Sequence, residues 1–167
     1  QNPVPILQVQ ERAKRLGAFD FNSRFYADDD LIVGAADPFQ LFRILHEVNI
    51  NGGFDVGTPV SFVLDQCHNI EAKIPGQIRS ILNVQEATAK ALLVDQVALK
   101  AAQKEGDVLE ANSVLMDAYN TDVRPLLEEW RADKGIDPNP MKAFKASGYL
   151  KKIADTRVGG NQAGWGA

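Results

Sequence analysis

Acidic and polar side chains gather where two short apolar segments of this sequence end. In the segment AFDFN, apolar and polar residues alternate, so Asp20 and Asn22 share the less apolar face of a predicted strand. The segment VSFVLD ends in the same way at Asp65. The residues with the chemistry of a site are Asp20, Asn22, Asp28, Asp30, Asp65 and His68. Their placement at segment ends predicts that they converge.

Several carboxylates in one place raise one another's pKa unless a cation compensates their charge. Oxygen ligands together with an imidazole suit Mg²⁺, Mn²⁺ or a related divalent metal. Two simpler interpretations stay open. The loop that carries Asp28 and Asp30 is also typical of a solvated turn, and His68 could be a structural histidine.

Two strands and one helix must position these side chains. We expect strands over residues 18–22 and 60–65, separated by a helix over residues 38–49 with Asp37 as its cap and Pro38 in its first turn. Strand, helix and strand predict one parallel βαβ unit. In parallel α/β folds, functional groups lie at the carboxyl ends of strands, where these acidic residues fall.

The rest of the sequence predicts helices. An N-terminal helix over residues 6–16 should stop at Gly17. The later helices are expected over residues 75–94, 96–104, 108–120, 123–132, 140–146 and 149–154. Residues expected to cap them or to lie in the turns between them are Asp95, Asp107, Asp122 and Asp137.

Composition excludes several classes of function. A net charge of −4 without a basic stripe argues against nucleic-acid binding, and the sequence has no apolar run near the ~20 residues that cross a bilayer. The one cysteine, Cys67, predicts a reducing compartment, the cytoplasm, and we interpret it as an inert buried thiol. The N-terminus lacks the pattern of a signal peptide. His46, inside a predicted helix without an acidic pair, is interpreted as structural.

Two long stretches carry a family resemblance. FDFNSRFYADDDLIVGAADPFQLFRI and, further on, FVLDQCHNIEAKIP resemble the L-rhamnose isomerases of pseudomonads and rhizobia, in the xylose-isomerase-like superfamily. The resemblance continues more loosely through NVQEATAKALLVD, AYNTDVRPLLEEWRADKG and ASGYLKKIA. It implies a metal-dependent sugar isomerase that interconverts L-rhamnose and L-rhamnulose, with Mn²⁺, or Mg²⁺, Co²⁺ or Zn²⁺, as the cofactor.

The resemblance also implies residue roles. Asp28 and Asp30 match loop aspartates that bind a second, catalytic metal. Asp65 matches a strand-end aspartate that binds a structural metal and can bridge the two, and His68 matches a histidine that fixes the site. Some members carry histidine at the position of Asp20, so this aspartate either substitutes an oxygen ligand or alters the metal preference. Substrate-binding residues are not assigned.

The fold implied by the resemblance is α/β, the C-terminal part of a (β/α)₈ TIM barrel followed by a mainly helical extension. We expect residues 1–95 to form the partial barrel with the metal-site loops, and residues 96–167 to form the extension. A whole barrel takes about 250 residues, so the chain is expected to lack earlier strands and their site residues. Exposed sheet edges predict that the chain associates, either with the missing barrel segment or as a homo-oligomer. The resemblance implies a tetramer, which is common in this family.

Two other functions stay open. One is a non-catalytic helical interaction or oligomerisation domain, in which the acidic loop is merely solvated. The other keeps the metal but catalyses a different reaction, such as epimerisation, because strand-end carboxylates serve several chemistries on barrels. Metal affinity separates the first alternative from an isomerase.

Overall fold

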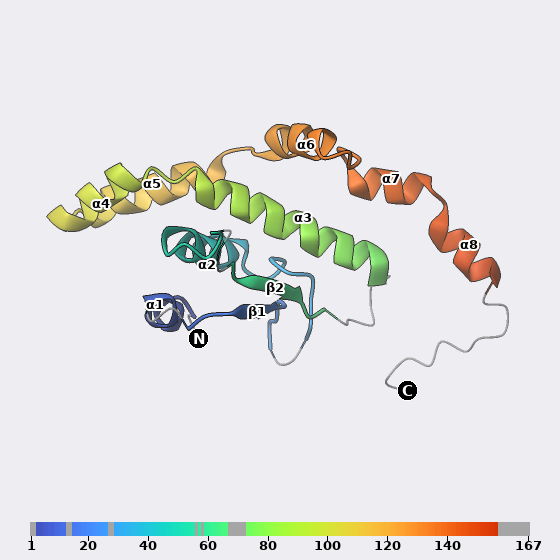
Figure 1. The fold of residues 1–167 in the computed structure, drawn as a ribbon, viewed down its shortest axis with the longest axis horizontal. Coiled ribbons are helices and arrows are strands. Elements are labelled where there is room, and N and C mark those ends of the chain that lie inside the picture. The colour runs from blue at the N-terminus through green and yellow to red at the C-terminus, as the bar shows by residue number, and fades with distance from the viewer. Residues whose placement is uncertain are drawn as a thin grey trace.

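The computed structural model describes residues 3–12, 15–26, 29–55, 57, 59–66 and 73–156. Its N-terminal part contains a small sheet with helices, and the described elements that follow the sheet are all helices (Figure 1). This is the order of elements that the sequence predicts.

A parallel βαβ unit forms the centre of the N-terminal part. Strand β1 (Ala18–Phe21) pairs in parallel with strand β2 (Ser61–Leu64), and helix α2 (Pro38–Ile50) lies between them in the sequence. The register sets Phe19 opposite Phe62. The predicted parallel unit is confirmed, although each strand is shorter than the alternation in the sequence suggests.

Local signals fix both ends of α2. The Asp37 carboxylate accepts a hydrogen bond of 2.8 Å from the Gln40 backbone N–H, as expected of an N-cap. After the helix, the chain turns sharply at Gly53, where an added Cβ would lie 2.5 Å from Cγ1 of Val48. Only glycine fits there without a shift of the neighbours. The Gly53 carbonyl accepts a hydrogen bond of 2.8 Å from the Val60 backbone N–H, which places Val60 at the start of β2.

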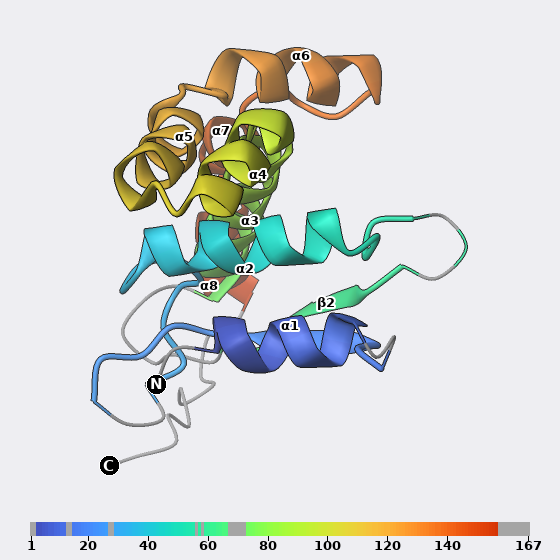
Figure 2. The same cartoon turned by 90° about the vertical axis from the view of Figure 1, so that its left-hand side faces the viewer.

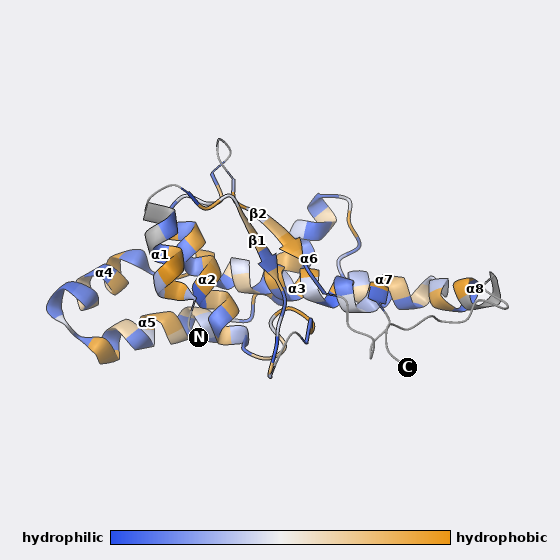
Figure 3. Cartoon of the chain, turned by 90° about the horizontal axis from the view of Figure 1, so that it is seen from below, coloured by the Kyte–Doolittle hydropathy of each residue, from blue (hydrophilic) through white to orange (hydrophobic). Residues whose placement is uncertain are grey.

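The hydrophobic core lies between one face of the sheet and the helices. Phe42 and Leu45 of α2 are completely buried, and the ring of Phe21 of β1 packs against that of Phe62 of β2, with the ring centroids 5.3 Å apart and the planes tilted by 56°. Figure 3 shows that hydrophobic residues of α1, α2 and β2 gather in the middle of the chain. This burial holds the strands against α2, so the carboxyl ends of the strands have a fixed support.

Helix α1 (Val4–Arg12) differs from the predicted helix over residues 6–16. It starts earlier because proline is tolerated in a first helical turn, where Pro5 lies, and Val4 and Leu7 bury their side chains. Residues 15–17 are not helical, so the prediction that Gly17 stops the helix is wrong.

Helix α3 (Lys73–Leu92) is the longest described element and crosses α2 at a steep angle (Figure 2). Its twenty residues span about 30 Å. The helices that follow are α4 (Gln96–Glu105), α5 (Val108–Asn120), α6 (Arg124–Asp133), α7 (Pro140–Ala146) and α8 (Tyr149–Thr156). Of these, α5, α6 and α7 pack against α3.

Helices α4 and α5 form a hairpin that extends beyond one end of α3, while α7 and α8 extend beyond the other (Figure 1). The predicted caps Asp95 and Asp107 are confirmed, because their carboxylates accept from the first backbone N–H groups of α4 and α5. Asp122 and Asp137 lie in turns, where each accepts a backbone N–H two residues further on.

Within the described residues, the only sheet has two strands, and no helix is long and apolar enough to cross a membrane. The expected barrel architecture and the expected division near residue 95 are not decided by this arrangement and stay predictions.

Candidate functional site

The face of the sheet that turns away from the helices carries the predicted polar residues. Asp20 lies opposite Val63 in the register, and both side chains are exposed, Val63 by 49%. The Asp65 backbone N–H donates to the Phe21 carbonyl over 2.9 Å, which continues the register and sets Asn22 beside Asp65. In the part of the chain that the structure describes, this face is open.

Asp30 returns to the same strand end from the loop. Its carboxylate accepts a hydrogen bond of 3.1 Å from Nδ2 of Asn22. The loop closes through a backbone bridge in which Ser23 and Leu31 exchange bonds of 3.2 and 2.8 Å. Asp30 has a φ of +46°, a left-handed conformation that few residues except glycine, asparagine and aspartate adopt. The backbone is therefore strained at Asp30, the residue whose carboxylate lies at the strand end.

Asp29, between the two predicted ligands, has a different role. Its carboxylate accepts the backbone N–H groups of Phe25 and Tyr26 at 2.7 and 3.0 Å. Such bonds are typical of an aspartate that stabilises its own turn. The turn interpretation of the acidic loop thus holds for Asp29, while Asp30 contacts the strand.

The structure brings part of the predicted site together. Asn22 and Asp30 touch, Asp65 neighbours Asn22 in the register, and Asp20 shares the open face. Asp28, His68 and Cys67 lie outside the described residues. Among the residues that are described, no three histidine, cysteine, aspartate or glutamate side chains come close enough to hold a metal. The donor types fit a hard divalent cation, but fewer donors are assembled than a complete site needs.

Three polar side chains on α3 support this site, and the sequence analysis missed them. Ser80 is fully buried, accepts the Val33 backbone N–H at 3.1 Å and donates to Oε1 of Gln66. Asn83 donates to the Val33 carbonyl at 2.8 Å, and Gln77 donates to the Gln66 carbonyl at 3.1 Å. The three-residue spacing of Gln77, Ser80 and Asn83 along one side of a helix is the signal that could have found them.

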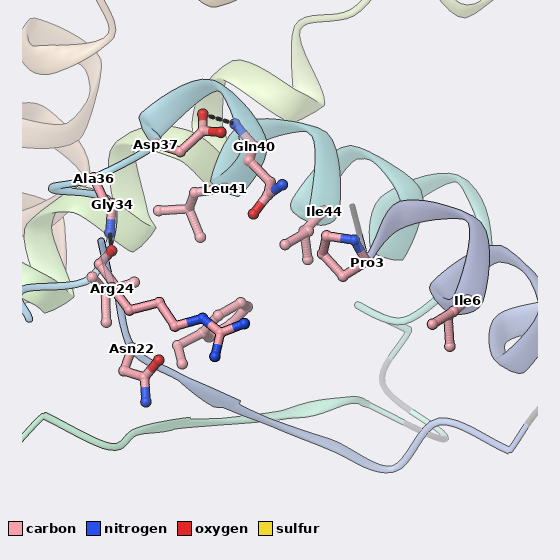
Figure 4. Close-up of a pocket in the computed structure, with 13 residues that line it drawn as sticks. Pro3, Ile6, Asn22, Arg24, Gly34, Ala36, Asp37, Gln40, Leu41 and Ile44 are labelled. Carbon is pink, nitrogen blue, oxygen red and sulfur yellow. Dashed lines mark hydrogen bonds between the residues drawn. The ribbon is translucent and has the colours of Figure 1, made fainter. Parts of the chain in front are cut away.

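A pocket of about 330 Å³ opens on the helical side of β1, between α1, α2 and the segment that follows β1 (Figure 4). Leu41, Ile44 and Ile6 give it apolar walls, and the guanidinium of Arg24 extends into it. Both Phe21 and Asn22 line the pocket, so it reaches the strand end where Asn22 bonds to Asp30, whereas Asp20, Asp30 and Asp65 do not line it. It does not join the predicted metal ligands.

His46 lies in the core and away from this site, in agreement with its structural interpretation. It is 5% exposed, stacks on Phe42, and its Nε2 lies 2.8 Å from the side-chain nitrogen of Gln96. Burial lowers the pKa of His46 below its ordinary value of 6.5. The ring therefore serves as a neutral acceptor that joins α2 to the first turn of α4.

Comparison with known proteins shows two relatives. The chain is 40% identical over 149 residues to a probable sugar isomerase of Mesorhizobium japonicum, an alignment that covers 86% of this chain and 34% of that protein. A probable sugar isomerase of Rhizobium meliloti is 38% identical over the same shares. The chain thus spans about a third of the length of these curated relatives. No protein-family model matches it.

Proposed function

We propose that this chain belongs to the metal-binding part of a sugar isomerase that interconverts an aldose and a ketose. The observation that carries the proposal is the 40% identity over 149 residues to a protein named as a probable sugar isomerase. The open strand end with Asp20, Asp30 and Asp65 supports it, because a parallel sheet presents functional groups at this position. In this proposal the two strands belong to a (β/α)₈ barrel, and their open face is the side turned toward its axis.

The cofactor that we propose is Mn²⁺, with Mg²⁺, Co²⁺ and Zn²⁺ as related choices. Asp20, Asp30 and Asp65, together with Asp28, would hold it through carboxylate oxygens. When bound, such a cation acts as a Lewis acid on the sugar oxygens. Within this chain, Asn22 orients the Asp30 carboxylate through the 3.1 Å hydrogen bond, and His68 is proposed to fix the site.

L-rhamnose is the sugar that we propose as substrate. The support is the resemblance of FDFNSRFYADDD and FVLDQCHN to L-rhamnose isomerases, since these stretches include the proposed ligands. The relatives are named only as probable sugar isomerases, so the choice of L-rhamnose rests on this resemblance. The single cysteine supports a cytoplasmic location.

Calorimetric titration with Mn²⁺ tests the metal site. We expect saturable binding to the full chain and loss of that binding in a variant with Asp28→Asn, Asp30→Asn and Asp65→Asn, because each amide removes a negatively charged ligand. The matched control carries Asp117→Asn and Asp133→Asn, exposed carboxylates on α5 and α6. Equal binding by wild type and triple variant would refute the proposed ligands.

An activity assay tests the reaction. The protein in its native form, with Mn²⁺, should convert L-rhamnose to L-rhamnulose, and a chelator should stop the conversion. Conversion of D-xylose at a higher rate would support an isomerase activity but contradict L-rhamnose as its preferred substrate. Formation of an epimeric aldose without ketose would favour the related epimerase reaction.

A second role is favoured by the α4–α5 hairpin. Val108 and Leu109 are 76% and 82% exposed at its outer end, and Val97, near the start of α4, is 81% exposed. Apolar side chains in such a group are typical of an association surface. We propose that this surface joins copies of the chain in a homo-oligomer, a role that is compatible with catalysis elsewhere in the molecule.

A further inference from the structure

We propose that Ser80 is a positioning residue that couples the two acidic segments of the site to each other through α3. One segment runs from Ser23 to Val33 and carries Asp30, and the other is Asp65 with Gln66. This inference rests on the proposed metal site for its functional meaning, but its structural content stands on the hydrogen bonds of α3 alone.

The Ser80 hydroxyl is the point where the two segments meet. It accepts the Val33 backbone N–H at 3.1 Å and donates its own proton to Oε1 of Gln66. A serine hydroxyl has one donor and two acceptor positions, so one oxygen satisfies both segments simultaneously. The side chain is fully buried, and water cannot replace either bond without opening the structure.

The neighbours of Ser80 on the same side of α3 hold one segment each. Asn83, one turn later, donates to the Val33 carbonyl at 2.8 Å and contacts only the first segment through this bond. Gln77, one turn earlier, donates to the Gln66 carbonyl at 3.1 Å and holds the second. Among the bonds between described residues, Ser80 is thus the one of the three side chains that bonds to both segments.

Coupling matters for a metal site because ligands must be held within about half an ångström of their productive positions. Asp30 and Asp65 belong to different segments, and their relative position depends on what joins those segments. The backbone bond from Asp65 to Phe21 and the side-chain bond from Asn22 to Asp30 act at the strand end. Ser80 fixes the same segments from the helix side.

Hydrogen exchange of the full chain, measured without metal, tests the division of roles. The reporters are the Leu31 amide, which bonds to the Ser23 carbonyl at 2.8 Å, and the Asp65 amide, which bonds to the Phe21 carbonyl at 2.9 Å. We expect Asn83→Ala to accelerate exchange at Leu31 only and Gln77→Ala at Asp65 only. Ser80→Ala should accelerate both by about tenfold, since two buried bonds are lost together.

The control is Thr88→Val, which removes a hydroxyl from the same helix. In the part of the chain that the structure describes, this hydroxyl bonds to the Val84 carbonyl within α3. The control variant should leave both reporters unchanged. If Ser80→Ala accelerates one reporter only, or accelerates every amide of the chain equally, the coupling role is overturned. Global loosening would mean that Ser80 supports the fold as a whole.

A Mn²⁺ titration of the same variants separates this inference from the proposed function. With coupling, Ser80→Ala weakens Mn²⁺ binding about tenfold while every ligand is retained, and Thr88→Val does not. Unchanged affinity in Ser80→Ala, with binding still lost in the aspartate variant, would overturn the coupling of the ligands and leave the metal site standing. Absence of binding in the wild type would reject the metal site, while the exchange experiment would still decide the role of Ser80.

Discussion

At the scale of single residues, His46 shows how burial decides a role. A histidine in a helix could be a ligand or a proton carrier, but this ring is packed against Phe42 and bonded to Gln96. The lowered pKa arises chiefly from burial; Glu47 and the Gln96 bond act to raise it, and Arg43 acts with burial to lower it. The folded state thus favours the neutral ring.

We expect the free energy of unfolding to decrease as the pH falls below 6.5. The unfolded chain binds a proton at His46 near that ordinary pKa, whereas the folded chain binds it only at lower pH. The decrease should level off below the folded pKa. Urea unfolding of wild type and His46→Gln between pH 7.5 and pH 5 measures it, and a decrease of equal size in the variant would contradict the assignment.

Asp30 permits a prediction about strain. Its φ of +46° is tolerated by aspartate and asparagine, but costs a residue such as alanine about 1–2 kcal/mol. Asp30→Ala should therefore lower the free energy of unfolding by about that amount in metal-free protein, and Asp30→Asn should change it by less than about 0.5 kcal/mol. Denaturant unfolding compares them, and equal stability of the two variants would show that the backbone relaxes.

At the scale of elements, helix caps account for the sharp helix ends after residue 92. Asp95 accepts two backbone N–H groups of α4 at 2.9 Å each, and the left-handed Gly106 ends the helix at a φ of +74°. Residues of these types at these places are also strong sequence signals. The later helices are thus found close to their predicted bounds.

Removal of one cap tests how far α4 depends on it. Asp95→Ala should lower the free energy of unfolding by about 1 kcal/mol, because two N–H groups lose their acceptor. Asp117→Ala, at an exposed position inside α5, serves as the control and should be close to neutral. A loss of the same size in both variants would point to charge and not to capping.

The sequence predicts elements better than it predicts their contacts. The alternation around Asp20 and Asn22 correctly indicates one open polar face, because neighbouring residues in a strand must point to opposite sides. The role of Ser80 depends on Val33 and Gln66, which are distant in the sequence and meet at one helix only in three dimensions. No local sequence pattern specifies these contacts between distant segments. The polar side chains on one side of α3 indicate only that polar groups must pack opposite them.

At the scale of the whole molecule, the described helices form an elongated arrangement (Figure 1). The α4–α5 hairpin extends beyond the end of α3, and apolar side chains on both of its helices are exposed. Exposed apolar residues of this kind support the proposed association.

Leu109→Lys tests whether the end of the hairpin joins copies of the chain. If it does, light scattering after size-exclusion chromatography should show a multimer for the wild type and a smaller species for Leu109→Lys, since a buried lysine charge is unfavourable. Gln103→Lys, which adds the same charge at an exposed site on α4, should leave the assembly intact. A monomeric wild type would rule out this surface as a self-association site.

The position of Ser80 in the chain also bears on when the acidic segments take their final places. Both segments precede α3 in the sequence, so a ribosome releases them before the helix that holds them. Until that helix has been synthesised and has docked on α2, neither Val33 nor Gln66 has its buried partner. The carboxylates therefore acquire their final spacing only after the strands that carry them have been made, when α3 docks.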